Sequence, residues 1–148
     1  MKDIVLQLIS LPIAVLIYIT GQFILMFIIT PLSKQRELIS EIAYELTFNE
    51  NNLYATSNSI DEKEDLERTK LQSKFRTLAS KLEPVSKSIF FYNFMSCVKA
   101  TLPIKDIKEA RSELIGLSNG VFSCPSKENE RGYQKKRVKK TRQLLKIS

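Results

Sequence analysis

The longest pattern in the chain is an apolar run near its N-terminal end. From Ile4 to Ser33 no residue is charged, and Ile4 to Ile29 consists almost entirely of apolar side chains. About 20 apolar residues are enough for a helix to cross the hydrocarbon core of a bilayer. A cleaved secretory signal has a shorter apolar stretch followed by a small-residue cleavage site, and this run has neither feature. We therefore predict a transmembrane anchor over residues 1–32.

After the anchor, apolar positions recur at the spacing of amphipathic helices. Thr30 followed by Pro31 is a favourable N-cap and first helical residue, so we expect a new helix to begin there. Ser59 and Glu62 have the spacing of a capping box for a second helix, which Pro84 is expected to stop. The apolar stripes of these helices are Ile39, Ile42, Ala43, Leu46 and Leu53 in the first, and Leu71, Phe75, Leu78, Ala79 and Leu82 in the second.

The segment from Ser86 to Ala100 is dense in large apolar and aromatic residues. It is too short to span a bilayer. We interpret it as the core helix of the domain. The alternative is a segment that lies on the membrane surface, because its aromatic residues occupy more faces than one buried stripe requires.

A last helix is predicted after Pro103, where Asp106 and Glu109 have capping spacing. Asn119 and Gly120 are expected to end it with a left-handed turn. Its apolar face consists of Ile107, Ala110, Leu114 and Leu117. Because no alternating strand pattern occurs, the fold class is all-α: a transmembrane helix, then a small antiparallel helical bundle over residues 33–122 and a basic tail over residues 123–148.

The charge of the chain is concentrated in that tail. Residues 126–148 hold nine Lys or Arg and two Glu, whereas residues 1–125 hold fourteen of each sign, so the net charge of +7 belongs to the last 23 residues. We expect the neutral domain to fold without them. The candidate contacts to anionic lipid or to an acidic partner are Lys135, Lys136, Arg137, Lys139, Lys140, Arg142 and Lys146. Nucleic acid would use the same cations, and a solvated, disordered tail is the remaining alternative.

The anchor carries two further signals. Lys2 precedes it and Lys34 and Arg36 follow it, which favours a cytoplasmic C-terminal domain.

Small or polar residues share one stripe of the anchor helix, and such stripes drive helix association in lipid, so a homo-oligomer is a candidate state. The stripe consists of Gln7, Ser10, Ala14, Ile17 and Gly21.

Little in the sequence indicates catalysis. The chain has no histidine, and Cys97 and Cys124 lack the CxxC spacing of a metal site. Glycine-rich phosphate loops and nucleophile motifs are also missing. We therefore expect no enzyme activity, no cofactor and no metal. The two cysteines are interpreted as small core residues, with a disulfide as the alternative if the domain is outside the cytoplasm.

Two strings of the sequence carry a resemblance to a known family. They are EIAYELTF at Glu41–Phe48 and LIGLSNGVF at Leu114–Phe122. Both resemble strings in an uncharacterised family of small bacterial single-pass membrane proteins, in which an apolar N-terminus precedes the first string. For residues 1–122 the resemblance implies a bacterial inner-membrane protein, and it implies no catalytic or ligand residue. The basic tail is an addition to the family pattern.

These observations favour a non-enzymatic membrane-anchored interaction protein that binds a protein partner through its helical domain. One alternative is a membrane-perturbing effector of a toxin or phage-defence system, in which associated anchors compromise the bilayer. A membrane-tethered nucleic-acid binder is the other, since phosphate contacts need cation density more than a particular fold.

Overall fold

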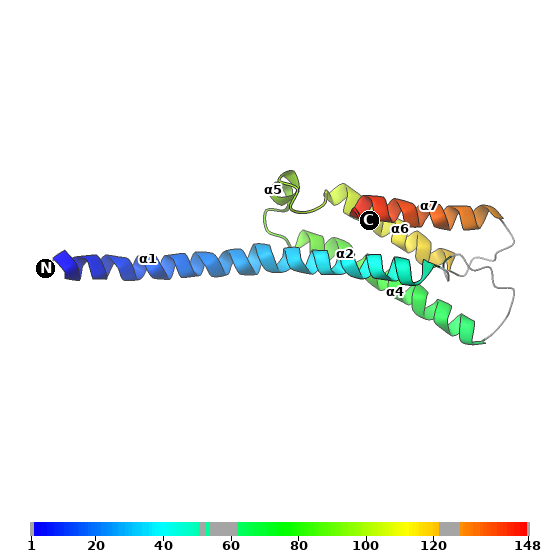
Figure 1. Ribbon diagram of the computed structural model, residues 1–148, viewed down its shortest axis with the longest axis horizontal. Coiled ribbons are helices and arrows are strands. Elements are labelled where there is room, and N and C mark those ends of the chain that lie inside the picture. Colours follow the sequence, from blue (N-terminus) through cyan, green and yellow to red (C-terminus); the bar gives the residue numbers. More distant parts are fainter. Residues whose placement is uncertain (1, 51–52, 54–61, 122–127, 148) are drawn as a thin grey trace.

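The computed structural model describes residues 2–50, 53, 62–121 and 128–147. For residues 2–11, 62, 64 and 128–131 it describes the backbone only. A long N-terminal helix leads into a bundle of helices at its far end (Figure 1). The described residues contain no β-strand. The all-α prediction is therefore confirmed, with an apolar helix that precedes a helical bundle.

The first helix runs without a break from the apolar segment into the bundle. It comprises α1 (Lys2–Ile24), one π-helical turn η1 (Leu25–Ile29) and α2 (Thr30–Phe48). The predicted helix start is confirmed, since α2 begins at Thr30, but its predicted N-cap is wrong: Thr30 keeps right-handed helical angles and donates its N–H to the Leu25 carbonyl. Pro31 has no N–H to give to the carbonyl four residues before it, and π-turns are a known way for a helix to continue past such a defect.

The bundle consists of α2, α4 (Glu62–Lys87), α6 (Ile104–Gly120) and α7 (Glu128–Leu145), with α6 packed against both α4 and α7. The predicted apolar stripes of α4 and α6 are confirmed, since every member is buried. In α2 the stripe is rotated slightly: Leu38 is buried, whereas Ile39 and Ala43 are only partly covered. The core cluster is Leu38, Ile42, Leu46, Leu53, Leu71, Phe75, Leu78, Ala79, Leu82, Leu102, Ile107, Ala110, Leu114, Leu117, Val138 and Leu145.

Helix α4 continues past Pro84, contrary to the expectation that this residue stops it. Pro84 lies in the last turn, where its missing N–H affects one hydrogen bond near the helix end. The residues after it have other partners: the Ser86 hydroxyl donates to the Leu82 carbonyl at 2.7 Å, and the Ser88 N–H donates to the Pro84 carbonyl at 3.0 Å. Local hydrogen bonds therefore continue the helix past the proline.

A buried polar group joins three elements at the end of the bundle nearest to α1. Gln35 of α2 is 2% exposed and donates from Nε2 to the Ser86 hydroxyl of α4 at 2.9 Å. Its Oε1 accepts a hydrogen bond from the Thr101 hydroxyl, just before α6. Both ends of the amide are thus satisfied, as a buried polar group requires.

The aromatic segment after α4 is not the core helix that the sequence suggested. It forms only one short helix, α5 (Tyr92–Cys97), and in this segment Ile89 alone among the large apolar side chains is buried. The exposed fractions are 62% for Phe91, 61% for Phe94 and 54% for Val98. Hydrophobicity alone does not distinguish a protein core from a surface that meets lipid.

The predicted caps of α6 are wrong at both ends. Pro103 occupies the N-cap without a side-chain hydrogen bond, and Gly120 does not adopt a positive φ. The glycines of α6 serve packing instead: a Cβ on Gly116 would lie 1.9 Å from the Arg137 guanidinium, and one on Gly120 would lie 1.3 Å from the Gln134 amide. These glycines let side chains of α7 cross closely over α6.

Helix α7 also corrects the domain boundary, since the basic segment is part of the bundle. Val138, Thr141 and Leu145 are buried at helical spacing and line the face of α7 that packs on the core. The alternative of a disordered tail therefore does not agree with the helix described here, whereas folding of the domain without this segment stays a prediction. Cys97 is exposed, against the core prediction, while Cys124 and the capping Ser59 lie outside the described residues.

A place for α7 in the core has a measurable consequence. Replacing Val138 with Ala removes buried apolar volume and should lower the free energy of unfolding by about 2 kcal/mol. For a domain of this size that is a fall in Tm of roughly 10 °C, which thermal unfolding of the detergent-purified chain followed by circular dichroism would detect. The exposed neighbour Lys139→Ala is the control and should leave Tm nearly unchanged; equal Tm values for both variants would contradict the packing of α7.

Candidate interaction surfaces

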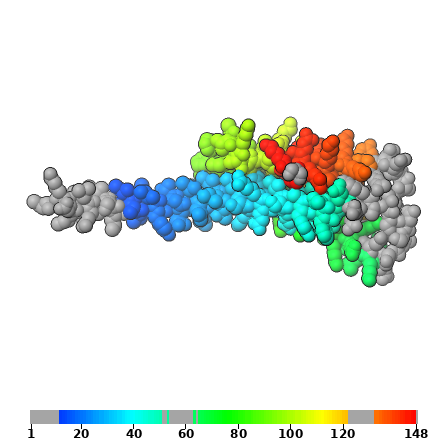
Figure 2. Space-filling view, viewed as in Figure 1, coloured from blue at the N-terminus to red at the C-terminus, as the bar shows by residue number. Residues whose placement is uncertain are grey.

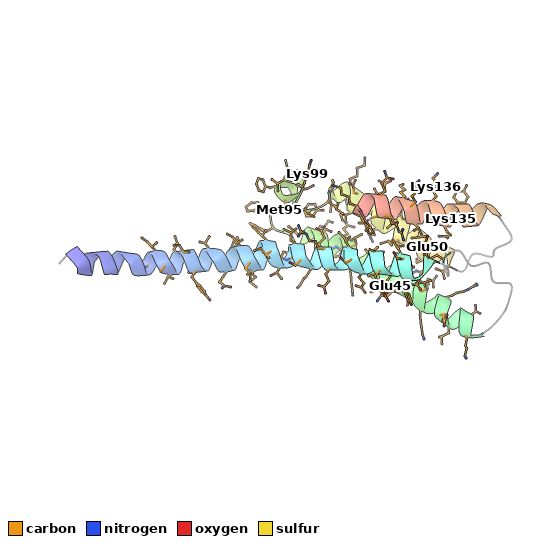
Figure 3. The ribbon with its side chains drawn as sticks, viewed as in Figure 1. Glu45, Glu50, Met95, Lys99, Lys135 and Lys136 are labelled. Atoms are coloured by element: carbon orange, nitrogen blue, oxygen red, sulfur yellow. The ribbon has the colours of Figure 1, made fainter. Side chains whose placement is uncertain are left out.

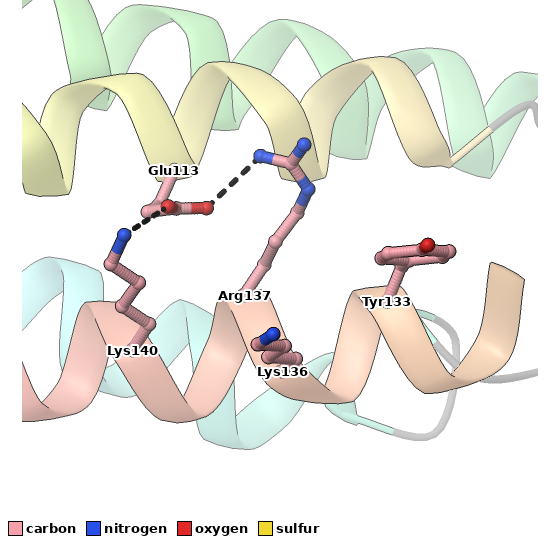
Figure 4. A pocket seen from close by; sticks show the side chains of 5 residues that line it. All are labelled: Glu113, Tyr133, Lys136, Arg137 and Lys140. Atoms are coloured by element: carbon pink, nitrogen blue, oxygen red, sulfur yellow. Dashed lines mark hydrogen bonds and ion pairs between the residues drawn. The ribbon is translucent and has the colours of Figure 1, made fainter.

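Three of the seven predicted cations on α7 point to acidic residues of the bundle. Arg137 contacts Glu113 of α6 at 3.0 Å, and Lys140 contacts Glu109 at 2.6 Å and Glu113 at 3.0 Å. Figure 4 shows Glu113 between Arg137 and Lys140, beside a cavity of about 230 Å³ that Tyr133 and Lys136 also line. Arg142 approaches Glu50 at 3.6 Å and the Thr47 hydroxyl at 3.2 Å. These cations hold α7 on the bundle.

The ion pair between Glu109 of α6 and Lys140 of α7 shifts the pKa of both groups. The hydrogen bond from Lys140, with the positive charge behind it, lowers the pKa of Glu109. The same contact and a second one to Glu113 raise the pKa of Lys140. Each shift stabilises the charged form of its group, so the Glu109–Lys140 pair stays ionised over the neutral pH range.

Other cations on α7 face outward. Lys135 and Lys136 (Figure 3) are exposed, and so is Lys139. Among the described residues, neither Lys136 nor Lys139 forms an ion pair, and the nearby Tyr133 is 64% exposed. This outer face combines available positive charge with an aromatic ring, a composition suited to a negatively charged partner.

The seventh cation, Lys146, lies in a different place. With Arg36 of α2 and Lys99 of the segment before α6, it lines a cavity of about 430 Å³ whose apolar wall includes Leu102 and Leu145. Composition pointed to Lys146, but sequence reasoning gave Arg36 no binding role and missed Lys99. One signal in the sequence could have indicated this site: the buried face of α2 contains a polar residue, Gln35, directly before Arg36.

An aromatic cluster attaches the α5 region to the apolar helix. The Phe90 N–H donates to the Phe27 carbonyl at 3.2 Å, the carbonyl that Pro31 leaves without its usual donor. The ring centroid of Phe90 lies 5.7 Å from that of Phe23 and 6.3 Å from that of Phe27. Figure 2 shows the α5 region resting on the side of the long helix. Its exposed aromatic side chains therefore lie beside the end of the apolar run.

The long helix itself is apolar and uncovered. It is long and apolar enough to span a membrane, and its most apolar part is not buried against the rest of the chain. Ala14, Ile17 and Gly21 of the predicted association stripe are exposed, and a Cβ on Gly21 would meet nothing within 4 Å. For Gln7 and Ser10, the other two residues of the stripe, the structure describes only the backbone. Association through this stripe stays a prediction.

Within the described part of the chain, no group of three or more His, Cys, Asp or Glu is placed to hold a metal ion. Comparison of the chain with family models, with curated proteins and with solved structures finds no match. The resemblance in the two short strings stays a prediction.

The Glu109–Lys140 pair predicts a pH dependence. Because folding lowers the pKa of Glu109, its contribution is fully present above the unfolded value of about 4.3 and is lost as the pH falls through the lower folded value. Glu109→Gln should therefore lower Tm at neutral pH and make no difference in strong acid. Thermal unfolding over a pH series measures this. Glu37→Gln, which changes an exposed carboxyl of α2 that is not part of the ion pairs between α6 and α7, is the control. A difference that persists in strong acid would contradict the ion-pair explanation.

Proposed function

We propose that this protein is a non-enzymatic, single-pass membrane-anchored interaction protein, whose bundle binds an acidic protein partner close to the bilayer. The observation that supports this most is the unbroken helix from the exposed apolar segment into the bundle. Such a helix would place the bundle at a fixed distance and angle from the membrane. A partner bound by the bundle would be held there too.

The exposure of the apolar helix supports the membrane location. Large side chains such as Leu16, Ile17 and Met26 are each about two-thirds exposed, at 67%, 66% and 68%. Leaving this surface in water is unfavourable by roughly 25 cal/mol per Å², and a bilayer removes the cost. Ile4 to Ile29 is about 39 Å long as a helix, which exceeds the hydrocarbon thickness of about 30 Å and leaves its end at the interface.

Cations at one end of the anchor support a cytoplasmic domain in a bacterial inner membrane. Lys34 and Arg36 follow the apolar run closely, and only Lys2 precedes it. The fold adds Lys99 and Lys146 to the same end, beside Arg36. An anionic cytoplasmic leaflet attracts such a cluster.

This orientation can be tested with reporters fused after Ser148 in a bacterial host. We expect a fluorescent protein to be bright and a periplasmic alkaline phosphatase to be inactive, because the positively charged side of the anchor stays in the cytoplasm. The matched control fuses both reporters before Met1, where the phosphatase should be active. An active phosphatase after Ser148 would reverse the proposed topology.

Distance from the bilayer favours a protein over lipid as the partner of the outer face of α7. Arg142 contacts Thr47, and Thr47 lies about 26 Å along the helix axis from Thr30. Helix α7 begins at its end far from the anchor and runs back towards it (Figure 1), and Lys136 and Lys139 come before Arg142 in this helix. Since charges are screened over about 8 Å at physiological ionic strength, these lysines are too far away to attract lipid headgroups strongly.

The partner proposal predicts the effect of charge reversal. Lys136→Glu with Lys139→Glu should abolish capture of a stoichiometric partner by the full chain, crosslinked in membranes and then purified. Lys70→Glu with Lys81→Glu makes the same charge change at exposed positions of α4 and should leave capture intact. Capture would be measured by quantitative mass spectrometry after nuclease treatment. Equal capture by both variants, or loss of the captured material to nuclease, would contradict an acidic protein as the partner.

A further inference from the structure

We infer that the cavity between α2, the residues before α6 and the end of α7 binds the phosphate headgroup of an anionic phospholipid. This inference depends on the proposed membrane anchor and uses residues other than those of the partner surface. The cavity measures about 430 Å³ and is lined by Arg36, Lys99 and Lys146, with no acidic residue in its wall. It therefore differs from the face of α7 that packs on α6, where Glu109 and Glu113 already neutralise the cations.

The chemistry of the lining suits a phosphodiester with apolar groups attached. A guanidinium offers paired N–H donors that match two phosphate oxygens, and the two ammonium groups add charge from other sides. Ile39, Leu102 and Leu145 provide apolar wall beside these cations. The volume falls within the range of about 300–1,000 Å³ that is usual for small-molecule sites, so one headgroup fits.

The backbone at both lysines gives a second, independent argument. Lys99 and Lys146 have φ values of 59° and 53°, and the remaining non-glycine residue with positive φ in the described chain is Phe91. Each lysine follows a helix end at the position where glycine is usual, because a Cβ is unfavourable in the left-handed region.

Hydrogen bonds define both of these helix ends. After α5, the Lys99 N–H donates to the Ser96 carbonyl at 3.1 Å and the Ala100 N–H donates to the Met95 carbonyl at 2.9 Å. The end of α7 repeats the arrangement, with the Lys146 N–H on the Gln143 carbonyl at 3.3 Å and the Ile147 N–H on the Arg142 carbonyl at 2.9 Å. Two separate helix ends thus hold a lysine where glycine would cost less, and both lysines line the same cavity.

The position of the cavity matches a lipid headgroup. Arg36 lies about 9 Å along the helix from Thr30, close to the end of the apolar run. The hydrogen bond from the Phe90 N–H to the Phe27 carbonyl holds the α5 region beside the end of the apolar run. Phe91, Phe94 and Val98 are exposed in this region. A lipid whose chains pack beside these side chains would carry its phosphate to the level of Lys99, which Figure 3 shows next to α5.

The test measures lipid retained by the full chain in mild detergent, by native mass spectrometry with phosphatidylglycerol and phosphatidylcholine of equal chain length. We expect the unaltered protein to retain phosphatidylglycerol preferentially. Lys99→Gly with Lys146→Gly should weaken its retention by about 25-fold, since each cation near anionic lipid contributes about a fivefold change in affinity. The same variant should keep or raise Tm, because glycine relieves both left-handed positions.

Two controls make the result specific. Lys136→Gln with Lys139→Gln removes the same charge from the outer face of α7 and should change retention less than twofold. Lys99→Arg with Lys146→Arg keeps the charges and should retain the lipid. Equal weakening in the Gly and Gln pairs, or unchanged retention in the Gly pair, would overturn the site. Full displacement of the lipid by excess inorganic phosphate would instead identify a site for free phosphate and overturn the lipid assignment. None of these results depends on capture of a protein partner.

Discussion

The buried amide of Gln35 is the constraint on which the arrangement of the bundle depends. It is 2% exposed, donates to Ser86 of α4 and accepts from Thr101 before α6. A buried polar group left without its partner costs about 1–3 kcal/mol, so α2, α4 and the residues before α6 cannot separate or slide at this level without that penalty. The register that results places Arg36, the next residue of α2, beside the residues around Thr101, and thus creates the cationic cavity.

This register extends from the bundle towards the anchor. Pro31, one turn before Gln35, removes a donor from the helix, and the Phe27 carbonyl accepts the Phe90 N–H instead. The end of α4 and the connection after it are therefore both tied to the long helix, α4 through Ser86 and the connection through Phe90. Because α1, η1 and α2 form one helix, a bilayer that sets the angle of α1 also sets the angle of the bundle, and the α5 region moves with both.

Helical periodicity predicted the parts of the fold that a single repeated stripe determines. The buried stripes of α4 and α6 followed from it, whereas Pro84 and Gly120 misled because local breaking and capping signals are weak compared with the packing of the whole helix. In α7 three buried positions are hidden among many lysines and arginines, so average polarity predicted a tail where spacing indicated a helix. The cavity joins single cations from distant segments, and only packing brings such residues together. No local pattern contains that information.

The seven cations of the predicted cluster show why a net charge does not define a role. A basic helix can join a bundle only where its inner charges meet acids, and Glu109 and Glu113 supply these on α6. Of the remaining cations, Lys136 lies on the outer face of α7, and Lys146 lies in the cavity nearer to the anchor. Lys139, the nearer of the two outer lysines, lies about 9 Å along α7 from its last residue, Leu145, which exceeds the screening length of about 8 Å at physiological ionic strength. The two groups of cations therefore act almost independently through charge, so occupancy of the lipid cavity would leave the affinity of the outer face for an acidic partner nearly unchanged.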